Sequence, residues 1–266
     1  MIRSINTEGW VELRGEQIPV EKGTLNLAGM HIRDLDEVHG LYSVKSLKKL
    51  NLSENYLVDI SGLAKIENLE ELSLFNNKLR DMRDVKLLRN LKSLTLSRNK
   101  IVDIAGLENC EKIAELFLDD NSINEIRGLE TLAHLRILWL GDNRIHEIKG
   151  LDRLAALEEL YLGYNGISKI TGLDHLVNLR ELVLFYNDIV DIEGFDNLMN
   201  LENLNLNHNR IKEIKGLGNL RKLKTIAVGK NPLPEQEIKR CGGVDKEGLA
   251  LDPVKFYLAC RKEVVT

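Results

Sequence analysis

Asparagine recurs at a fixed interval of 22 residues through most of this chain. The nine positions are Asn55, Asn77, Asn99, Asn121, Asn143, Asn165, Asn187, Asn209 and Asn231. A constant interval of this length is typical of a repeat protein, in which each repeat is one structural unit that stacks on its neighbours. The chain is therefore expected to fold as a one-dimensional stack, and its function should depend on surface residues that lie between the constant positions.

Apolar residues surround each asparagine in a constant frame. In the stretch 137–141, Leu138 and Leu140 alternate with other residue types, which predicts a short strand with both leucines on its buried face. Asn143 follows this strand, where its amide can both donate and accept hydrogen bonds to the backbone of adjacent turns. The next apolar residues come at intervals of three, which suits 3₁₀ or short helical turns, and they are Ile145, Ile148, Leu151, Leu154 and Leu157.

The number of repeats follows from the period. Eight complete 22-residue periods run from residue 50 to residue 225, preceded by a 25-residue repeat that begins at residue 25 and followed by a partial repeat, 226–233. One repeat cannot bury enough apolar surface to fold alone, so its neighbours must supply the rest. We expect ten parallel strands. A glycine such as Gly150 also recurs once per repeat, which predicts a tight backbone position, although Asp84 replaces it in one repeat.

Both ends of the chain depart from the period. Residues 10–20 alternate around a glycine, which predicts a β-hairpin that covers the first edge of the sheet. Near the other end, Asp252 and Pro253 predict the start of a terminal helix. We expect the apolar face that closes the core to consist of Val254, Tyr257, Leu258 and Val264. The chain thus divides into an N-terminal cap with the hairpin, the repeats, and a C-terminal cap with the helix, at residues 1–24, 25–233 and 234–266.

Composition limits the classes of function. The chain has 37 Lys and Arg residues against 41 Asp and Glu residues, a net charge of −4, which argues against a strongly cationic binder of nucleic acid or membranes. No apolar stretch has the length of a membrane span, and the N-terminus is too polar for a secretion signal. The three cysteines lack a tight spacing, which favours reduced thiols and a cytoplasmic location, while the pairing of Cys241 with Cys260 stays open.

No motif for catalysis or metal binding is present. The six histidines have no ligand spacing, and nothing matches a phosphate-binding loop, a zinc-binding pair or a nucleophile elbow. The sequence therefore predicts a protein that is not an enzyme, with no catalytic residues, no metal and no cofactor.

The repeated frame, with its I-x-x-I-x-G-L-x-x-L-x-x-L return arm, resembles leucine-rich repeat proteins. It is similar to the subclass typified by the nuclear regulatory subunit of protein phosphatase 1, and to internalins and an axonemal dynein light chain. The resemblance covers residues 25–233. It implies an α/β solenoid, a curved right-handed superhelix with a parallel sheet of about ten strands on the concave face and 3₁₀ or short helical turns on the convex side. The C-terminal cap departs from that of the phosphatase regulator and resembles intracellular archaeal repeat proteins, which weakens the case for phosphatase binding.

The concave face can be predicted by taking every twenty-second residue, since each such column crosses adjacent strands about 4.8 Å apart. One column places Phe117, Trp139 and Tyr161 side by side as an aromatic ridge. The column two positions later contains Gly141 and Gly163, which leave room beside the ridge. Further aromatic and acidic residues flank it. The candidate partner-binding residues are Phe75, Phe117, Asp119, Trp139, Asp142, Glu159, Tyr161, Tyr164, Glu181, Phe185 and Tyr186.

Large rings on an exposed sheet face are typical of protein interfaces, and the acidic rim favours a partner with a basic contact surface. The alternative is that the rings merely pack on one another and the acids provide solubility. We therefore expect a protein-binding scaffold that is monomeric in isolation, with self-association left open. One other hypothesis is a regulatory subunit of a phosphatase or another enzyme, with a site at the glycine gap. Nucleic-acid binding through Arg98 and Lys49 is less favoured, because acids share that face.

Overall fold

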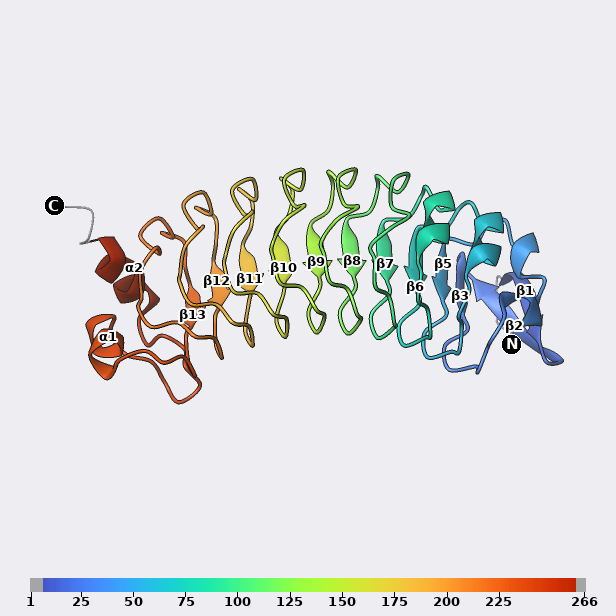
Figure 1. Cartoon of the computed structure of the whole chain (residues 1–266). Coiled ribbons are helices and arrows are strands. Elements are labelled where there is room, and N and C mark those ends of the chain that lie inside the picture. The colour runs from blue at the N-terminus through green and yellow to red at the C-terminus, as the bar shows by residue number, and fades with distance from the viewer. Residues whose placement is uncertain (1–6, 262–266) are drawn as a thin grey trace, which may run out of the picture.

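The computed structural model describes residues 7–261, which form a curved solenoid whose strands join into one continuous sheet (Figure 1). The sheet has 13 strands, of which ten are parallel and come one from each repeat. The predicted fold class and number of parallel strands are confirmed. These strands are β3 (Thr24–Asn26), β5 (Lys49–Asn51), β6 (Glu71–Ser73), β7 (Ser93–Thr95), β8 (Glu115–Phe117), β9 (Ile137–Trp139), β10 (Glu159–Tyr161), β11 (Glu181–Val183), β12 (Asn203–Asn205) and β13 (Thr225–Ala227).

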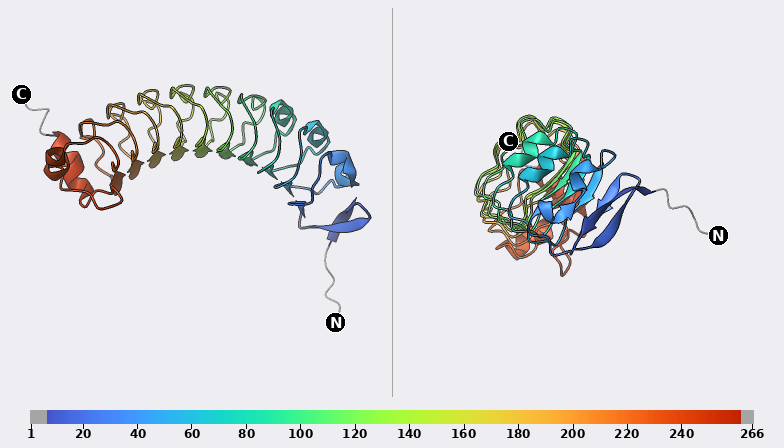
Figure 2. Two further views of the ribbon diagram at one scale, coloured as in Figure 1. Left: turned by 60° about the horizontal axis from the view of Figure 1, so that its bottom comes forward. Right: turned by 90° about the vertical axis from the view of Figure 1, so that its right-hand side faces the viewer.

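The parallel sheet lines the inner side of the arc, and the return arms form the outer side (Figure 2). Leu138 and Leu140 are completely buried, whereas Trp139 between them stays partly exposed on the inner face. Ile145, Ile148 and Leu151 on the return arm are likewise buried, so that the core lies between the sheet and the return arms. The alternation in the sequence therefore separates core leucines from the side chains of the concave face.

The repeated asparagines form a ladder of hydrogen bonds between repeats. The side-chain Oδ1 of Asn187 accepts from the backbone N–H of Ile167 at 3.0 Å. Its Nδ2 donates to the carbonyl oxygens of Leu162 at 2.9 Å and Leu184 at 3.1 Å. Each asparagine thus satisfies buried backbone groups of its own turn and of the preceding repeat. The predicted role of this residue is confirmed.

The return arm has two forms, one with a 3₁₀ helix and one without. Within residues 7–261, 3₁₀ helices occur only at η1 (Leu35–Glu37), η2 (Leu41–Ser43), η3 (Ser61–Lys65) and η4 (Arg83–Leu87). Asp84 lies inside η4. In later repeats the glycine takes a positive φ, as at Gly150, where φ is 71° and a Cβ would lie 2.5 Å from the carbonyl oxygen of Ile126. Asp84 could not adopt this close approach without strain. Gly62, at the equivalent position in η3, has no positive φ either, so the 3₁₀ form of the arm does not depend on this residue alone.

Two antiparallel strands, β1 (Thr7–Leu13) and β2 (Glu16–Glu21), form a hairpin at the N-terminal end. β2 pairs antiparallel with β3, so the hairpin lies against the first parallel strand. The short strand β4 (Val38–His39) pairs with the other edge of β1. Val11 and Val20 of the hairpin are completely buried and extend the core past the first repeat. The hairpin therefore covers the edge of the sheet that β3 would otherwise expose.

At the C-terminal end, backbone groups of residues 245–250 cover the last strand. The N–H of Ala250 donates to the carbonyl oxygen of Ile226 at 2.8 Å, and the N–H of Val228 donates to that of Gly248 at 2.9 Å. Two helices complete this end, α1 (Glu235–Arg240) and α2 (Pro253–Arg261). The predicted start of the terminal helix at Pro253 is confirmed. No helix within residues 7–261 has the length and apolar character that crossing a membrane requires.

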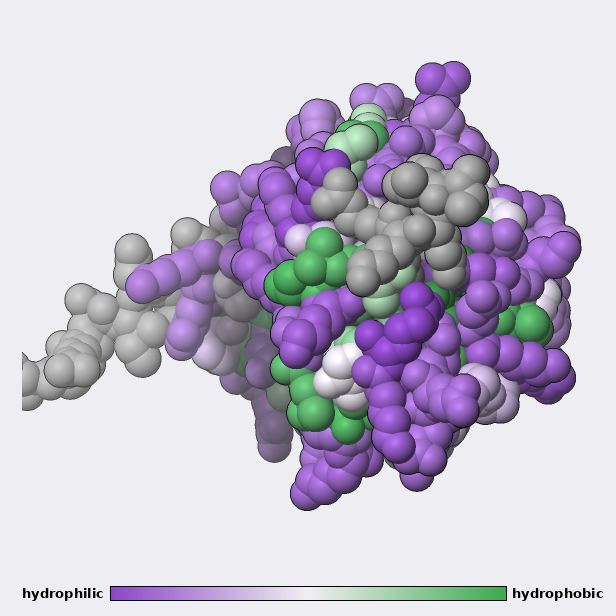
Figure 3. Space-filling view, turned by 90° about the vertical axis from the view of Figure 1, so that its left-hand side faces the viewer, coloured by the Kyte–Doolittle hydropathy of each residue, from purple (hydrophilic) through white to green (hydrophobic). Residues whose placement is uncertain are grey.

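The predicted apolar face of α2 was wrong. Phe256 and Ala259 are buried, whereas Val254 is 48% and Leu258 is 42% exposed. Tyr257 is partly buried against the core, and Val264 lies outside the described residues. The guanidinium of Arg240 in α1 donates to the carbonyl oxygens of Ala259 and Ile214, each at 3.1 Å, which fixes the rotation of α2 against the last repeat. Viewed onto this end, apolar side chains appear within a mostly polar surface (Figure 3).

Candidate functional site

Phe117, Trp139 and Tyr161 lie next to one another on β8, β9 and β10, and we call them the aromatic ridge. The ring centroids of Phe117 and Trp139 are 5.1 Å apart at an interplanar angle of 86°. Those of Trp139 and Tyr161 are 4.7 Å apart at 46°. The sequence prediction that these three rings are contiguous is confirmed. Each ring is partly buried by its neighbours, and the buried Nε1–H of Trp139 has no hydrogen-bond partner.

A second group of rings, the aromatic stack, consists of Tyr164, Tyr186 and His208 with Phe185 at its edge. The centroids of Tyr164 and Tyr186 are 4.5 Å apart with nearly parallel planes. Tyr186 and His208 are 3.9 Å apart, again nearly parallel. The prediction included both tyrosines and Phe185 but omitted His208. The repeat period could have predicted His208 as a member, because it lies 22 residues after Tyr186 in the same column.

The backbone beneath the aromatic stack is strained. Tyr164, Tyr186 and His208 have φ values of 54°, 53° and 54°, in the left-handed region that disfavours bulky side chains. Each such residue costs on the order of 1 kcal/mol or more. Asn76 and Asp120 occupy the same position in other repeats, and short polar side chains tolerate this conformation better. The rings are therefore kept at an energetic cost, and Tyr164 remains 50% exposed.

Only one of the two predicted glycine gaps exists. A Cβ on Gly163 would lie 2.6 Å from the ring of Phe185, so this ring covers Gly163 and fills the expected space. The sequence pattern did not show this, because it gives columns but not the lean of a side chain toward the preceding repeat. Gly141 remains open. A Cβ there would meet a single atom within 4 Å, the carbonyl oxygen of Gly163 at 3.3 Å.

The four predicted rim acids differ in their surroundings. Glu181 accepts a hydrogen bond at 2.6 Å from the hydroxyl of Tyr161, which ties this acid to the ridge. Burial, and next this hydrogen bond, raise the pKa of Tyr161. Burial, and next the negative charge of Glu181, raise the pKa of Glu159. Asp119 accepts from the hydroxyl of Ser97 at 2.6 Å, and Asp142 is exposed. Among the described side chains, no Lys or Arg forms an ion pair with any of these four acids.

Phe75 lies apart from the two aromatic groups. The guanidinium of Arg98 lies over its ring at 5.4 Å from the centroid and also pairs with Asp120 at 3.4 Å. Lys49, the other cation considered for nucleic-acid binding, pairs with Glu71 at 2.6 Å. Both cations therefore already form ion pairs with acids of this chain.

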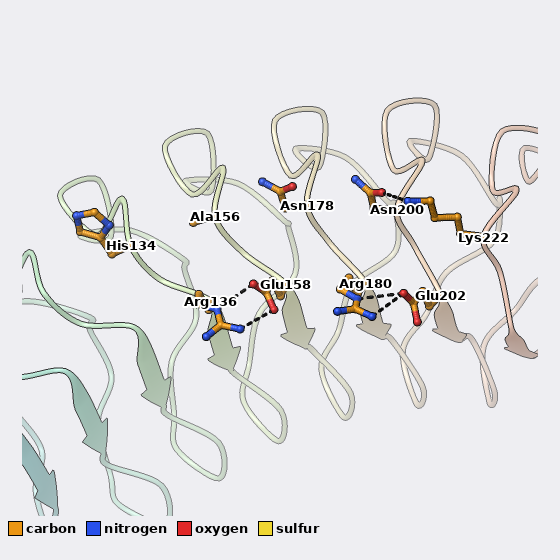
Figure 4. A pocket seen from close by; sticks show the side chains of 9 residues that line it. All are labelled: His134, Arg136, Ala156, Glu158, Asn178, Arg180, Asn200, Glu202 and Lys222. Carbon is orange, nitrogen blue, oxygen red and sulfur yellow. Dashed lines mark hydrogen bonds and ion pairs between the residues drawn. The ribbon is translucent and has the colours of Figure 1, made fainter.

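A groove of about 630 Å³ runs along one flank of the solenoid, beside the beginnings of the strands (Figure 4). Arg136 donates two hydrogen bonds, each of 2.9 Å, to the carboxylate of Glu158. Arg180 donates two hydrogen bonds, of 3.1 and 2.7 Å, to one carboxylate oxygen of Glu202. Such exposed pairs stabilise little individually, but they connect adjacent repeats. This ladder was not predicted from the sequence, although opposite charges alternate every 22 residues in this column apart from a gap at Ala114. The charged residues are Lys48, Glu70, Lys92, Arg136, Glu158, Arg180, Glu202 and Lys224.

Several solved structures share this fold. Internalin C2 from Listeria monocytogenes superposes with a TM-score of 0.61 at 24% identity, over 79% of this chain and 84% of that one. The ectodomain of the receptor kinase GASSHO1/SCHENGEN3 from Arabidopsis thaliana gives 0.63 at 28% identity, over 73% of this chain and 25% of that one. The plant peptide hormone receptor RGFR1 gives 0.61 at 29% identity, over 73% and 34%. This chain thus spans about a quarter of one plant receptor and about a third of the other.

The family follows from the sequence itself. No curated protein matches the chain significantly. The family model for Leucine Rich repeats (2 copies) matches five overlapping segments that together cover more than half of the chain, residues 45–87, 67–109, 133–175, 155–197 and 177–219. These segments contain the same alternating leucines and ladder asparagines that build the parallel sheet. The chain therefore belongs to the leucine-rich repeat family.

Proposed function

We propose that this protein is a non-enzymatic interaction scaffold that binds a partner protein on the concave face between β8 and β12. One observation carries the proposal. The four rim acids, Asp119, Asp142, Glu159 and Glu181, form no ion pair with a described Lys or Arg and lie in the repeats of the aromatic ridge and the aromatic stack, whereas Glu71 on β6, outside these repeats, is paired with Lys49.

This combination has the character of an interface. Tyrosine and tryptophan are enriched among the residues that dominate binding energy, and the ridge offers both in partly exposed form. The carboxylates would attract a basic surface and steer its approach. We therefore propose a partner whose contact surface carries arginine or lysine.

Known proteins of this fold are consistent with such a role. Leucine-rich repeat proteins generally act as interaction scaffolds, and the plant receptor RGFR1 was solved in complex with RGF2. A regulatory subunit of an enzyme, including a phosphatase, would use the same face with the enzyme as partner. We further propose an intracellular location, because Cys110 is a free thiol buried in the core.

The test compares wild-type protein with Trp139→Ala as bait, and then titrates the recovered partner. Loss of a central interface ring costs about 2 kcal/mol or more, so the affinity should fall roughly 30-fold. The convex variant Lys149→Ala should bind normally. Glu159→Lys combined with Glu181→Lys should slow association and alter its salt dependence. Unchanged affinity of Trp139→Ala together with a loss for Lys149→Ala would move the site to the convex side.

A further inference from the structure

Gly141 marks an open space between the aromatic ridge and the aromatic stack. It lies two residues after Trp139, so a side chain at this position would point to the same face as the indole. In the next repeat the ring of Phe185 covers Gly163, which places an aromatic ring beside the open position. Tyr164 contacts Phe185 with its centroid 5.0 Å away. The space above Gly141 is thus bordered by aromatic rings.

Two carboxylates without ion-pair partners flank the same space. Asp119 occupies the position equivalent to Gly141 in the preceding repeat, and Asp142 follows Gly141 in the chain. The backbone fixes this neighbourhood, since the N–H of Asp120 donates to the carbonyl oxygen of Gly141 at 2.9 Å. Neither acid forms an ion pair with a described Lys or Arg, and one oxygen of Asp119 accepts from the hydroxyl of Ser97, so both carboxylates can accept a further donor.

The chain itself shows how such a position is filled elsewhere. Arg98, on the same edge of the concave face, has its guanidinium over the ring of Phe75 and pairs with Asp120. A guanidinium suits this arrangement because it is flat, stacks on aromatic rings and donates in several directions within its plane. One arginine can therefore stack on a ring and pair with two carboxylates at once, whereas the compact ammonium of lysine cannot stack in this way.

We propose that the space above Gly141 receives an arginine side chain of the partner, with the guanidinium between Asp119 and Asp142 and stacked against the neighbouring rings. This inference rests on the proposed function, since it names the group that the concave face recognises. It assigns the aromatic rings and the acids to a single site.

The test is a titration of the full chain with N-acetyl-arginine amide, followed by NMR of the indole N–H signals. The chain has two tryptophans, and Trp10 in β1 lies at the far N-terminal end, which makes its signal an internal control. We expect a saturable shift of the Trp139 signal and none for Trp10. N-acetyl-citrulline amide has the shape of the arginine compound without its charge. N-acetyl-lysine amide has the charge but lacks the planar guanidinium group. Both should bind at least about tenfold more weakly.

Two variants localise the binding. Asp142→Asn should weaken it, whereas the convex variant Glu147→Gln, which removes the same charge, should not. Gly141→Leu should block the space without removing charge. The fold accepts a side chain there, because Phe75 and Phe185 occupy this position in their repeats and Gly141 is not among the glycines with positive φ. Equal shifts with the citrulline compound, or full binding to both Asp142→Asn and Gly141→Leu, would overturn the site.

This titration needs no natural partner, so it separates the two proposals. Loss of partner binding in Trp139→Ala without any binding of the arginine compound would retain the concave interface and reject the arginine site. Unchanged partner affinity in Trp139→Ala would reject the proposed interface, whatever the result of the arginine titration.

Discussion

The side-chain oxygen of Asn143 accepts a hydrogen bond from the backbone N–H of Ile123 at 2.9 Å, across the boundary between two repeats. Its Nδ2 also donates to the carbonyl oxygens of Leu118 and Leu140. Asn143→Ala should leave these groups unpaired at about 1 to 3 kcal/mol each and lower the denaturant midpoint clearly. Asn68→Ala is the control, because that amide makes one exposed bond, to Lys45. Similar midpoints for the two variants would reject the structural importance of the ladder.

Trp139 carries a buried Nε1–H without an acceptor. An unpaired buried donor costs about 1 to 3 kcal/mol, and phenylalanine removes it while keeping an aromatic ring between Phe117 and Tyr161. We therefore expect Trp139→Phe to be at least as stable as the wild type, and Trp139→Ala to be less stable. Equilibrium unfolding in urea measures both. A clear loss of stability in Trp139→Phe would mean that the indole N–H is hydrogen-bonded in solution.

Glu159 should make stability depend on pH. Because burial and the charge of Glu181 raise its pKa, the folded state binds the proton more tightly than the unfolded chain. The resulting stabilisation is present below the ordinary pKa of 4.5 and is lost as the pH rises through the raised value. Glu159→Gln should therefore be more stable than the wild type at neutral pH and equal to it in acid. Unfolding curves across this pH range measure the difference, with Glu147→Gln on the convex side as control. A gain that persists in acid would contradict this account.

The sequence was sufficient for the features that repeat. Asn143 recurs because every turn has the same unpaired backbone groups, and Leu138 and Leu140 recur because every strand faces the same core. The contact between Phe117 and Trp139 could also be predicted, since parallel strands in register bring residues 22 positions apart together. These relationships depend on the period alone.

Features that break the period could not be predicted in the same way. The lean of Phe185 over Gly163 depends on a side-chain rotation that no column reveals. The buried face of α2 depends on Arg240, which lies 19 residues from Ala259 and is matched to it only in the folded cap. The pairing of Arg136 with Glu158 follows from a column of alternating charge, but that column lies before the strands and outside the columns of the concave face.

Gly248 allows the C-terminal segment to cover the last strand, and its role can be tested by comparison with Gly15. Gly248 and Gly15 have nearly equal φ values of 84° and 83°. A Cβ on Gly15 would meet nothing within 4 Å, whereas one on Gly248 would overlap the backbone of Gly229. Gly15→Ala should therefore cost only the left-handed strain, about 1 to 2 kcal/mol.

Gly248→Ala should lose more stability than Gly15→Ala, because its methyl group must also push residues 245–250 away from β13. The bonds from Ala250 to Ile226 and from Val228 to Gly248 would weaken, and the edge of β13 would become available to other chains. We expect a lower urea midpoint and a tendency to aggregate, measured by light scattering, and the same behaviour when the chain is ended at Lys230. Equal losses for the two alanine variants, with a monodisperse truncated chain, would show that this segment does not protect the sheet.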